Sequence, residues 1–145
     1  MTSGLGASLK RIGAITLFVE DLPRTKTFYR NVLGLTGVFE DENSAAFDLG
    51  GTIVNLLAVS AAPELITPGT VAGPDVGARS QLTIDVDDVD AVCAELDGRG
   101  VVLLNGPLDR PWGVRTACFT DPAGHVWELA QPLAPADASG EPTTP

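Results

Sequence analysis

The chain contains an internal repeat, and this repeat limits its possible folds more than any other feature of its 145 residues. Three pairs of segments match in order: VEDL at 19–22 with VDDV at 86–89, Gly34 with Gly100, and GTIVNL at 51–56 with GHVWEL at 124–129. In each half, the apolar pattern predicts a strand, a helix and three further strands. One such unit leaves one face of its sheet bare, so the two should combine. We therefore predict an α+β fold in which two βαβββ modules form a curved mixed sheet around a cleft, with the helices on the outside.

Individual elements follow from alternation in the strands and from the residues at the helix ends. Asp21 and Asp88 stand where a side chain can cap a helix, and Pro23 suits a first helical turn. Glycines past the last apolar residue, Gly34 and Gly100, end the two helices. Strands are expected at about 12–20, 35–41, 44–50, 52–59, 81–86, 101–105, 114–120 and 125–131.

Composition along the chain predicts where the modules begin and end. Residues 60–79 are rich in Pro, Gly and Ala without a sustained period, which is typical of a linker or a lid loop. The expected segments are a flexible arm at 1–11, a first module at 12–59, the linker or lid loop at 60–79, a second module at 80–131 and a disordered tail at 132–145.

The last expected strand contains a carboxylate that needs an explanation. Residues 121–124, Asp-Pro-Ala-Gly, predict a turn before it. Alternation then places Glu128 on one face and Trp127 on the other, so Glu128 must face water or have a partner. His125 should point away from Glu128, and we interpret it as a turn residue with local hydrogen bonds. The surroundings of Glu128 are therefore the first place to look for a function.

Composition and charge exclude several function classes. The formal net charge of −10 repels phosphate backbones and anionic lipid, so neither nucleic acid nor a membrane is expected as a partner. No run of about 18 apolar residues is present, and the N-terminal segment lacks the apolar core of a signal peptide, so we expect a cytoplasmic protein. Cys93 and Cys118 lack the paired spacing of a metal or redox site and are expected to be reduced core residues.

Two segments carry a resemblance to a known family. VEDLPRTKTFYRNVLGL at 19–35 and WGVRTACFTDPAGHVWEL at 112–129, in the order βαβββ-βαβββ, are similar to the vicinal oxygen chelate superfamily, the glyoxalase, bleomycin-resistance and extradiol dioxygenase group. The resemblance covers about residues 12–131. It implies the fold directly, whereas for function it leaves several chemistries and pure binding open.

The resemblance also implies where a metal would be held in the family's enzymes. Those positions, one in the first and one in the last strand of each half, are Ala14, Asn55, Gln81 and Glu128. Ala14 has no donor atom, and two amides with one carboxylate make a poor set for a divalent ion. We therefore expect no metal and no other cofactor, with a divalent metal as the less favoured alternative.

Alternation places a set of side chains in the expected cleft. Aliphatic side chains at 15, 17, 19 and at 82, 84, 86 should pack against the helices, so the side chains between them point into the cleft. The expected ligand-binding residues are Thr16, Phe18, Asn55, Leu57, Gln81, Thr83, Asp85 and Glu128, with Phe39, Phe47 and Trp112 at the rim. Arg115 is expected either to contact the ligand or to pair with a nearby acid. Such a site favours an aromatic or cationic small molecule.

Three functions remain open at this point. The first is a metal-independent small-molecule binding protein of the bleomycin-resistance type that sequesters a drug or natural product, as in antibiotic resistance. The second is a glyoxalase-like lyase or isomerase with Glu128 as general base and a metal held by Glu128, Gln81 and water. The third is a metal-free enzyme of secondary metabolism in which Glu128 or Asp85 has a raised pKa. Relatives with this doubled unit commonly pair, so a homodimer is expected.

Overall fold

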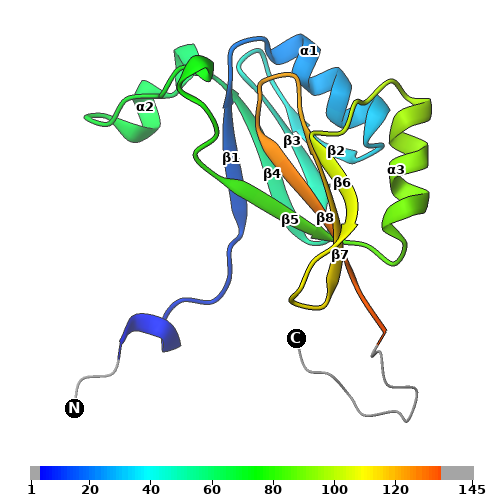
Figure 1. The fold of residues 1–145 in the computed structure, drawn as a ribbon. Helices are drawn as coiled ribbons and strands as arrows, with labels where there is room; N and C mark the ends of the chain where they lie inside the picture. Colours follow the sequence, from blue (N-terminus) through cyan, green and yellow to red (C-terminus); the bar gives the residue numbers. More distant parts are fainter. Residues whose placement is uncertain (1–3, 135–145) are drawn as a thin grey trace. The chain divides into compact units, whose positions relative to one another are not determined.

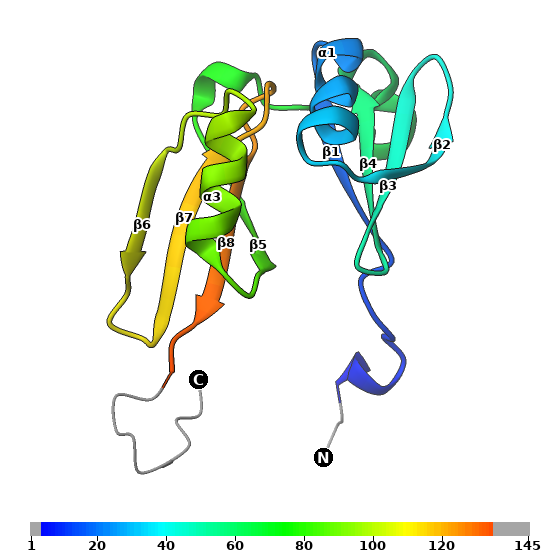
Figure 2. The same ribbon diagram turned by 90° about the vertical axis from the view of Figure 1, so that its right-hand side faces the viewer.

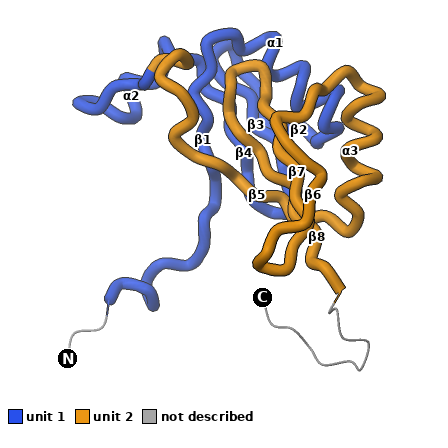
Figure 3. The backbone as a smooth tube through the Cα atoms, in the orientation of Figure 1, with its two compact units in different colours: residues 1–72 blue, residues 73–145 orange. Residues whose placement is uncertain are grey.

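The computed structural model describes residues 4–134 and has an α+β fold with two compact units. Unit 1 spans Met1–Ala72 and unit 2 spans Gly73–Pro145 (Figure 3). The boundary between the units lies inside the segment 60–79, for which the sequence predicts a linker or lid. No helix of the described residues is long and apolar enough to cross a membrane.

Unit 1 contains a four-stranded mixed sheet with one helical face (Figure 1). Its elements are β1 (Ala14–Val19), α1 (Leu22–Thr27), the π-helical segment η2 (Phe28–Val32), β2 (Thr36–Glu40), β3 (Ser44–Leu49) and β4 (Thr52–Ala58). The strand order is β1-β4-β3-β2, with β1 parallel to β4 and the other pairs antiparallel. A short 3-10 helix, η1 (Leu5–Ala7), precedes β1.

The first helix begins and ends where the sequence predicts. Asp21 accepts a hydrogen bond from the backbone N–H of Arg24, 3.1 Å away, which satisfies one of the free donors of the first turn. After η2, Gly34 has a φ of +70°, a conformation that few other residues adopt, and the helix stops there. The core under this helix consists of Leu17, Val19, Tyr29, Phe47, Val54 and Leu56.

Residues 60–79 contain short helical turns, so the segment is not an extended connector. Its elements are η3 (Val59–Ala61), α2 (Pro63–Ile66) and η4 (Pro74–Val76). Within it, a cavity of about 360 Å³ is lined mainly by apolar residues of unit 1 between Val59 and Val71. A role of this segment as a lid stays a prediction.

Unit 2 repeats the architecture of unit 1, which confirms the internal repeat. Its elements are β5 (Gln81–Asp85), α3 (Val89–Gly98), β6 (Asn105–Asp109), β7 (Val114–Thr120) and β8 (Val126–Pro132). The strand order is β5-β8-β7-β6, with β5 parallel to β8 and the other pairs antiparallel. Figure 2 shows α3 over one face of this sheet, and Asp88 caps the helix by accepting a hydrogen bond from Ala91 N–H.

The expected strand at 101–105 is wrong, because β6 begins at Asn105 and continues to Asp109. The apolar run 101–104 suggested a buried strand, but Val102 is 88% exposed. At Gly106, with a φ of +86°, an added Cβ would lie 2.5 Å from the carbonyl oxygen of Thr116. The close approach of β6 to β7 therefore depends on this glycine, and Pro107 is tolerated because β6 is an edge strand.

The end of the chain also departs from expectation at one point. The last strand extends to Pro132, where the sequence predicts the start of a disordered tail. Leu133 continues the pairing, because its N–H donates to the carbonyl of Gly113 over 3.0 Å. Residues 135–145, the rest of that expected tail, and residues 1–3 of the expected arm lie outside the described residues.

Candidate functional site

The two faces of the second sheet differ in chemistry, and the strand register shows which residues share a face. On one face, Gln131 accepts a hydrogen bond from Val89 N–H at the start of α3, and Trp127 and Leu129 are buried. Glu128 lies between these residues along β8 and so belongs to the opposite face. We call this opposite face the Glu128 face; it carries Gln81, Thr83, Asp85, Thr116, Cys118 and Glu128.

Glu128 has a specific partner on this face. It is half-buried, and its Oε1 accepts a hydrogen bond from the Thr83 hydroxyl over 2.9 Å. The two residues are 45 positions apart in the chain, and parallel pairing of β5 with β8 brings them side by side. This bond leaves much of the carboxylate free for a ligand, because a carboxylate has about four acceptor positions.

Cys118 lies directly across from Glu128 in β7 and is buried, as is Cys93 in α3. The Gln81 amide nitrogen lies 3.2 Å from the Cys118 sulfur. Burial raises the pKa of the Cys118 thiol, and the negative charge of Glu128 raises it further, against smaller opposing effects. The uncharged thiol of Cys118 is therefore favoured over the thiolate, and both cysteines are free and buried in the core as expected.

Arg110 also belongs to this region, although the sequence reasoning did not select it. Its Nε donates to the Thr116 hydroxyl over 2.9 Å, which places the side chain on the Glu128 face. Its guanidinium carbon lies 5.8 Å from the ring centroid of Trp112, which is 63% exposed in the β6–β7 turn. The sequence signal was the spacing in Arg-Pro-Trp-Gly, where a cation stands two residues before an aromatic ring at a tight turn.

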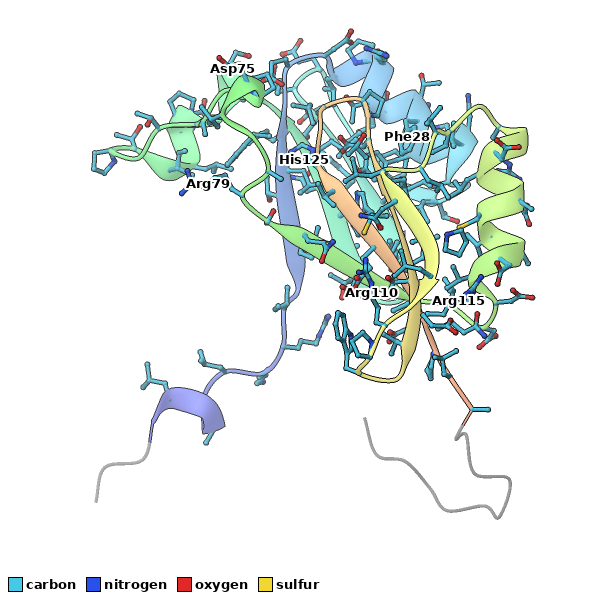
Figure 4. The ribbon with its side chains drawn as sticks, in the orientation of Figure 1. Phe28, Asp75, Arg79, Arg110, Arg115 and His125 are labelled. Carbon is cyan, nitrogen blue, oxygen red and sulfur yellow. The ribbon has the colours of Figure 1, made fainter. Side chains whose placement is uncertain are left out.

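Arg115 has one of the two roles that the sequence analysis offers for it. Arg115 donates to Asp90 of α3 over 2.9 Å and to Asp109 of β6 over 2.9 Å, so it lies on the helix-covered face (Figure 4). The charge of Arg115 lowers the pKa of Asp90 mainly through this hydrogen bond. Of the two expected roles of Arg115, ion pairing is the one present, and it joins α3 to the β6–β7 hairpin.

The expected site residues of unit 1 lie mostly on the face of its sheet away from α1. Register pairs Thr16 with Asn55 and Phe18 with Leu57, all on this face. Phe39, which is 57% exposed, pairs with Ala46 on the same face after a bulge in β2. A common ligand-binding role for these residues stays a prediction.

Phe47 requires a correction, because the sequence placed it with the rim aromatics. It is fully buried on the helix side of the first sheet, where its ring stacks on Tyr29 with 6.0 Å between centroids. Arg30 lies over the ring at 6.0 Å, beside a cavity of about 310 Å³ that Phe39 and Glu40 also line. Alternation alone could not show which face of β3 packs under the helix.

His125 has the local role that the sequence predicts. Its Nδ1 lies 2.9 Å from Oδ2 of the buried Asp121, and Oδ1 of the same carboxylate accepts hydrogen bonds from the backbone N–H groups of Ala123 and His125. Asp121 thereby organises the turn between β7 and β8. This turn sets the register that aligns Glu128 with Cys118.

The donor set does not fit a divalent metal. The described residues contain no group of three or more His, Cys, Asp or Glu side chains that could hold one. At the four positions that the family resemblance implies, Ala14 offers no donor, the Asn55 and Gln81 side chains are neutral amides, and Glu128 is the one carboxylate.

Known proteins share this fold and parts of this sequence. The model of the Glyoxalase/Bleomycin resistance protein/Dioxygenase superfamily matches residues 11–129. The uncharacterized protein YraH of Bacillus subtilis is 31% identical over 124 residues, which cover 82% of this chain and 96% of YraH. A virulence protein of Salmonella typhimurium is 25% identical over 126 residues, which cover 85% of each chain.

Solved structures agree with these sequence relationships. A crystal structure of a glyoxalase/bleomycin resistance protein/dioxygenase from Nocardioides has a TM-score of 0.77 at 25% identity and covers 90% of this chain and 88% of its own. The family match, the repeated βαβββ units and the relative at 31% identity lead to one conclusion. The chain belongs to the Glyoxalase/Bleomycin resistance protein/Dioxygenase superfamily.

Proposed function

We propose that this member of the superfamily is a metal-independent small-molecule binding protein whose Glu128 face contacts the ligand. The Thr83–Glu128 hydrogen bond is the observation that carries this proposal. It holds a half-buried carboxylate in place while leaving acceptor positions open, as a pre-organised ligand contact requires. The poor metal donor set supports binding without a metal rather than metal chemistry.

The charge of the face indicates the kind of ligand. Glu128 and Asp85 share it, and the whole chain has a formal net charge of −10, so a cationic group is attracted. The exposed indole of Trp112 offers a surface on which a planar ring can stack. A planar cationic drug or natural product matches both features, and its sequestration is the proposed role.

A metal-free enzyme is the second candidate, favoured by the same hydrogen bond. Thr83 holds Oε1 of Glu128, which orients the carboxylate as proton transfer requires. The two candidates differ in outcome, because an enzyme converts its ligand whereas a sequestering protein returns it unchanged. NMR spectra of each bound compound after prolonged incubation distinguish them.

The test uses the full chain purified without chelator. Metal content is measured by mass spectrometry, and a library of planar, polycyclic and cationic compounds is screened by melting temperature with and without EDTA. At a hundredfold excess over its dissociation constant, a ligand stabilises the folded state by about 2.7 kcal/mol. We expect hits that survive EDTA and weaken in Glu128→Gln.

Glu95→Gln is the matched control, because Glu95 is an exposed acid of α3 that pairs with Arg99. Hits that require one bound metal ion per chain contradict the proposal. The same conclusion follows if no compound binds, or if Glu128→Gln and Glu95→Gln have equal effects.

We further propose that the protein acts as a cytoplasmic homodimer. The doubled unit supports this, because relatives that contain it commonly pair. Light scattering should give twice the 15.0 kDa of the chain. A particle of chain mass across micromolar concentrations contradicts it.

A further inference from the structure

Arg110 is a half-buried cation on a face that otherwise carries acids. Among residues 4–134, five other basic side chains pair with carboxylates: Lys26, Arg30, Arg99, Arg115 and His125. The Arg110 guanidinium forms no ion pair within that part of the chain and instead contacts Thr116 and Trp112. Its charge is therefore available to a group that comes from outside the unit.

The two contacts hold Arg110 in a defined position. The Thr116 hydroxyl engages Nε, and the Trp112 ring lies 5.8 Å from the guanidinium carbon, so the planar group is fixed at both its edge and its face. A guanidinium has five N–H donors, and Thr116 takes one of them. The remaining fork matches a carboxylate or phosphate with two parallel hydrogen bonds.

The positions of Arg110 and Glu128 determine how far apart opposite charges on a ligand should lie. Arg110 is bonded to Thr116, and Glu128 faces Cys118, two residues further along β7. Two residues of a strand span about 7 Å, and Glu128 lies on β8 whereas Arg110 follows β6, on the other side of β7, so the two charged sites are separated by at least about 7 Å. Both groups act on the pKa of the Cys118 thiol, which Glu128 raises and Arg110 lowers because their charges have opposite signs.

We infer that the ligand is a planar aromatic zwitterion, whose anionic group is held by Arg110 and whose cationic group reaches Glu128. This inference rests on the proposed function and narrows its ligand class. An acidic protein that bound only cations would gain nothing from an unpaired arginine beside the ligand, since that charge repels them. Recognition of both charges also disfavours ligands that carry only an amine or only an acid.

Three probes test the inference on the full chain treated with EDTA. The first is an aminomethyl-naphthoate with its two charged groups at opposite ends of the ring system. The second, naphthoate, keeps only the negative charge, and the third, naphthylmethylamine, keeps only the positive charge. Affinities are measured by isothermal titration for the wild type, Arg110→Met and Arg110→Lys. Arg99→Met is the matched control, because Arg99 lies at the far end of α3.

We expect the two-charge probe to bind at least fivefold more tightly than either single-charge probe. Arg110→Met should weaken both carboxylate probes about tenfold and leave naphthylmethylamine unchanged or tighter. Arg110→Lys should restore part of the loss, because it keeps the charge without the fork. If Arg110→Met does not fold, the affinities of Arg110→Lys and the wild type are compared instead. Arg110→Lys should then weaken the carboxylate probes and leave the affinity for the amine unchanged.

Three results overturn the inference. The first is that the three probes bind with equal affinity or that none of them binds. The second is that Arg110→Met weakens naphthylmethylamine as much as it weakens the two carboxylate probes. The third is that Arg99→Met weakens the carboxylate probes as much as Arg110→Met does. Failure here differs from failure of the proposed function. If library hits bind in a way that depends on Glu128 but not on Arg110, the proposed binding function stands and only the inference of a zwitterionic ligand is wrong.

Discussion

The Thr83 hydroxyl donates a 2.9 Å hydrogen bond to the Glu128 carboxylate and thereby links the first and last strands of unit 2. These strands pair in parallel, with Thr83 directly beside Glu128. The bond crosses 45 positions of sequence, so only the folded sheet can form it. It gives the half-buried Glu128 carboxylate a fixed orientation.

Thr83→Val removes this hydrogen bond while keeping a β-branched side chain. Because Thr83 is exposed, we expect the free energy of unfolding to fall by about 1 kcal/mol or less. Ligand affinity should fall by about fivefold, because Glu128 loses its orientation. Urea unfolding and titration with a screening hit measure the two effects. Thr83→Ser keeps the hydroxyl and should retain affinity; equal losses in both variants would rule out the hydrogen bond as the cause.

The two tryptophans should respond in opposite ways to truncation. Trp127 is 3% exposed, so Trp127→Ala should lower the free energy of unfolding by about 3–5 kcal/mol. Trp112 is 63% exposed, and Trp112→Ala should change stability by about 0.5 kcal/mol or less while weakening aromatic ligands. Urea unfolding together with ligand titration separates the two effects. If Trp127→Ala folded stably but did not bind the ligand, while Trp112→Ala bound it normally, the ligand would lie on the face of the sheet that carries Trp127 and not on the Glu128 face.

The Arg115–Asp90 ion pair should make stability depend on pH. Arg115 lowers the pKa of Asp90 in the folded state, so the pair stabilises the fold above the ordinary Asp pKa of about 3.9 and the contribution is lost as pH falls below it. Arg115→Met should therefore be less stable than the wild type at neutral pH, with the difference shrinking on acidification. Thermal unfolding of both proteins from neutral pH to pH 3 measures this. A difference that stays constant over the range would show that lost packing, not charge, is responsible.

Gly106 should be far less tolerant of substitution than Gly98. An added Cβ at Gly106 meets the Thr116 carbonyl oxygen at 2.5 Å, and φ is +86°, so Gly106→Ala should lower the free energy of unfolding by about 2 kcal/mol or more. At Gly98, in α3, nothing lies within 4 Å of the added atom, so Gly98→Ala should be neutral or stabilising by about 0.4–1 kcal/mol. Urea unfolding compares the two. Equal stabilities would mean that β6 can move away from β7.

The repeat, the helix caps and the faces of β1, β4, β5 and β8 could be predicted from the sequence because they depend on local rules. Asp21 and Asp88 cap helices through residues three positions ahead. The alternation that separates Glu128 from Trp127 is a property of any extended chain. His125 likewise bonds to a residue four positions away.

Tertiary structure decided the features that depend on contacts between distant segments. The apolar run at 101–104 looked like a strand, but β7 pairs instead with the segment beginning at Asn105. Phe47 lies on β3 and Arg115 on β7, and packing under Tyr29 and pairing with Asp90 determined the direction of these side chains. Alternation tells which residues share a face, whereas the face that a helix covers depends on the free energy of packing the whole unit.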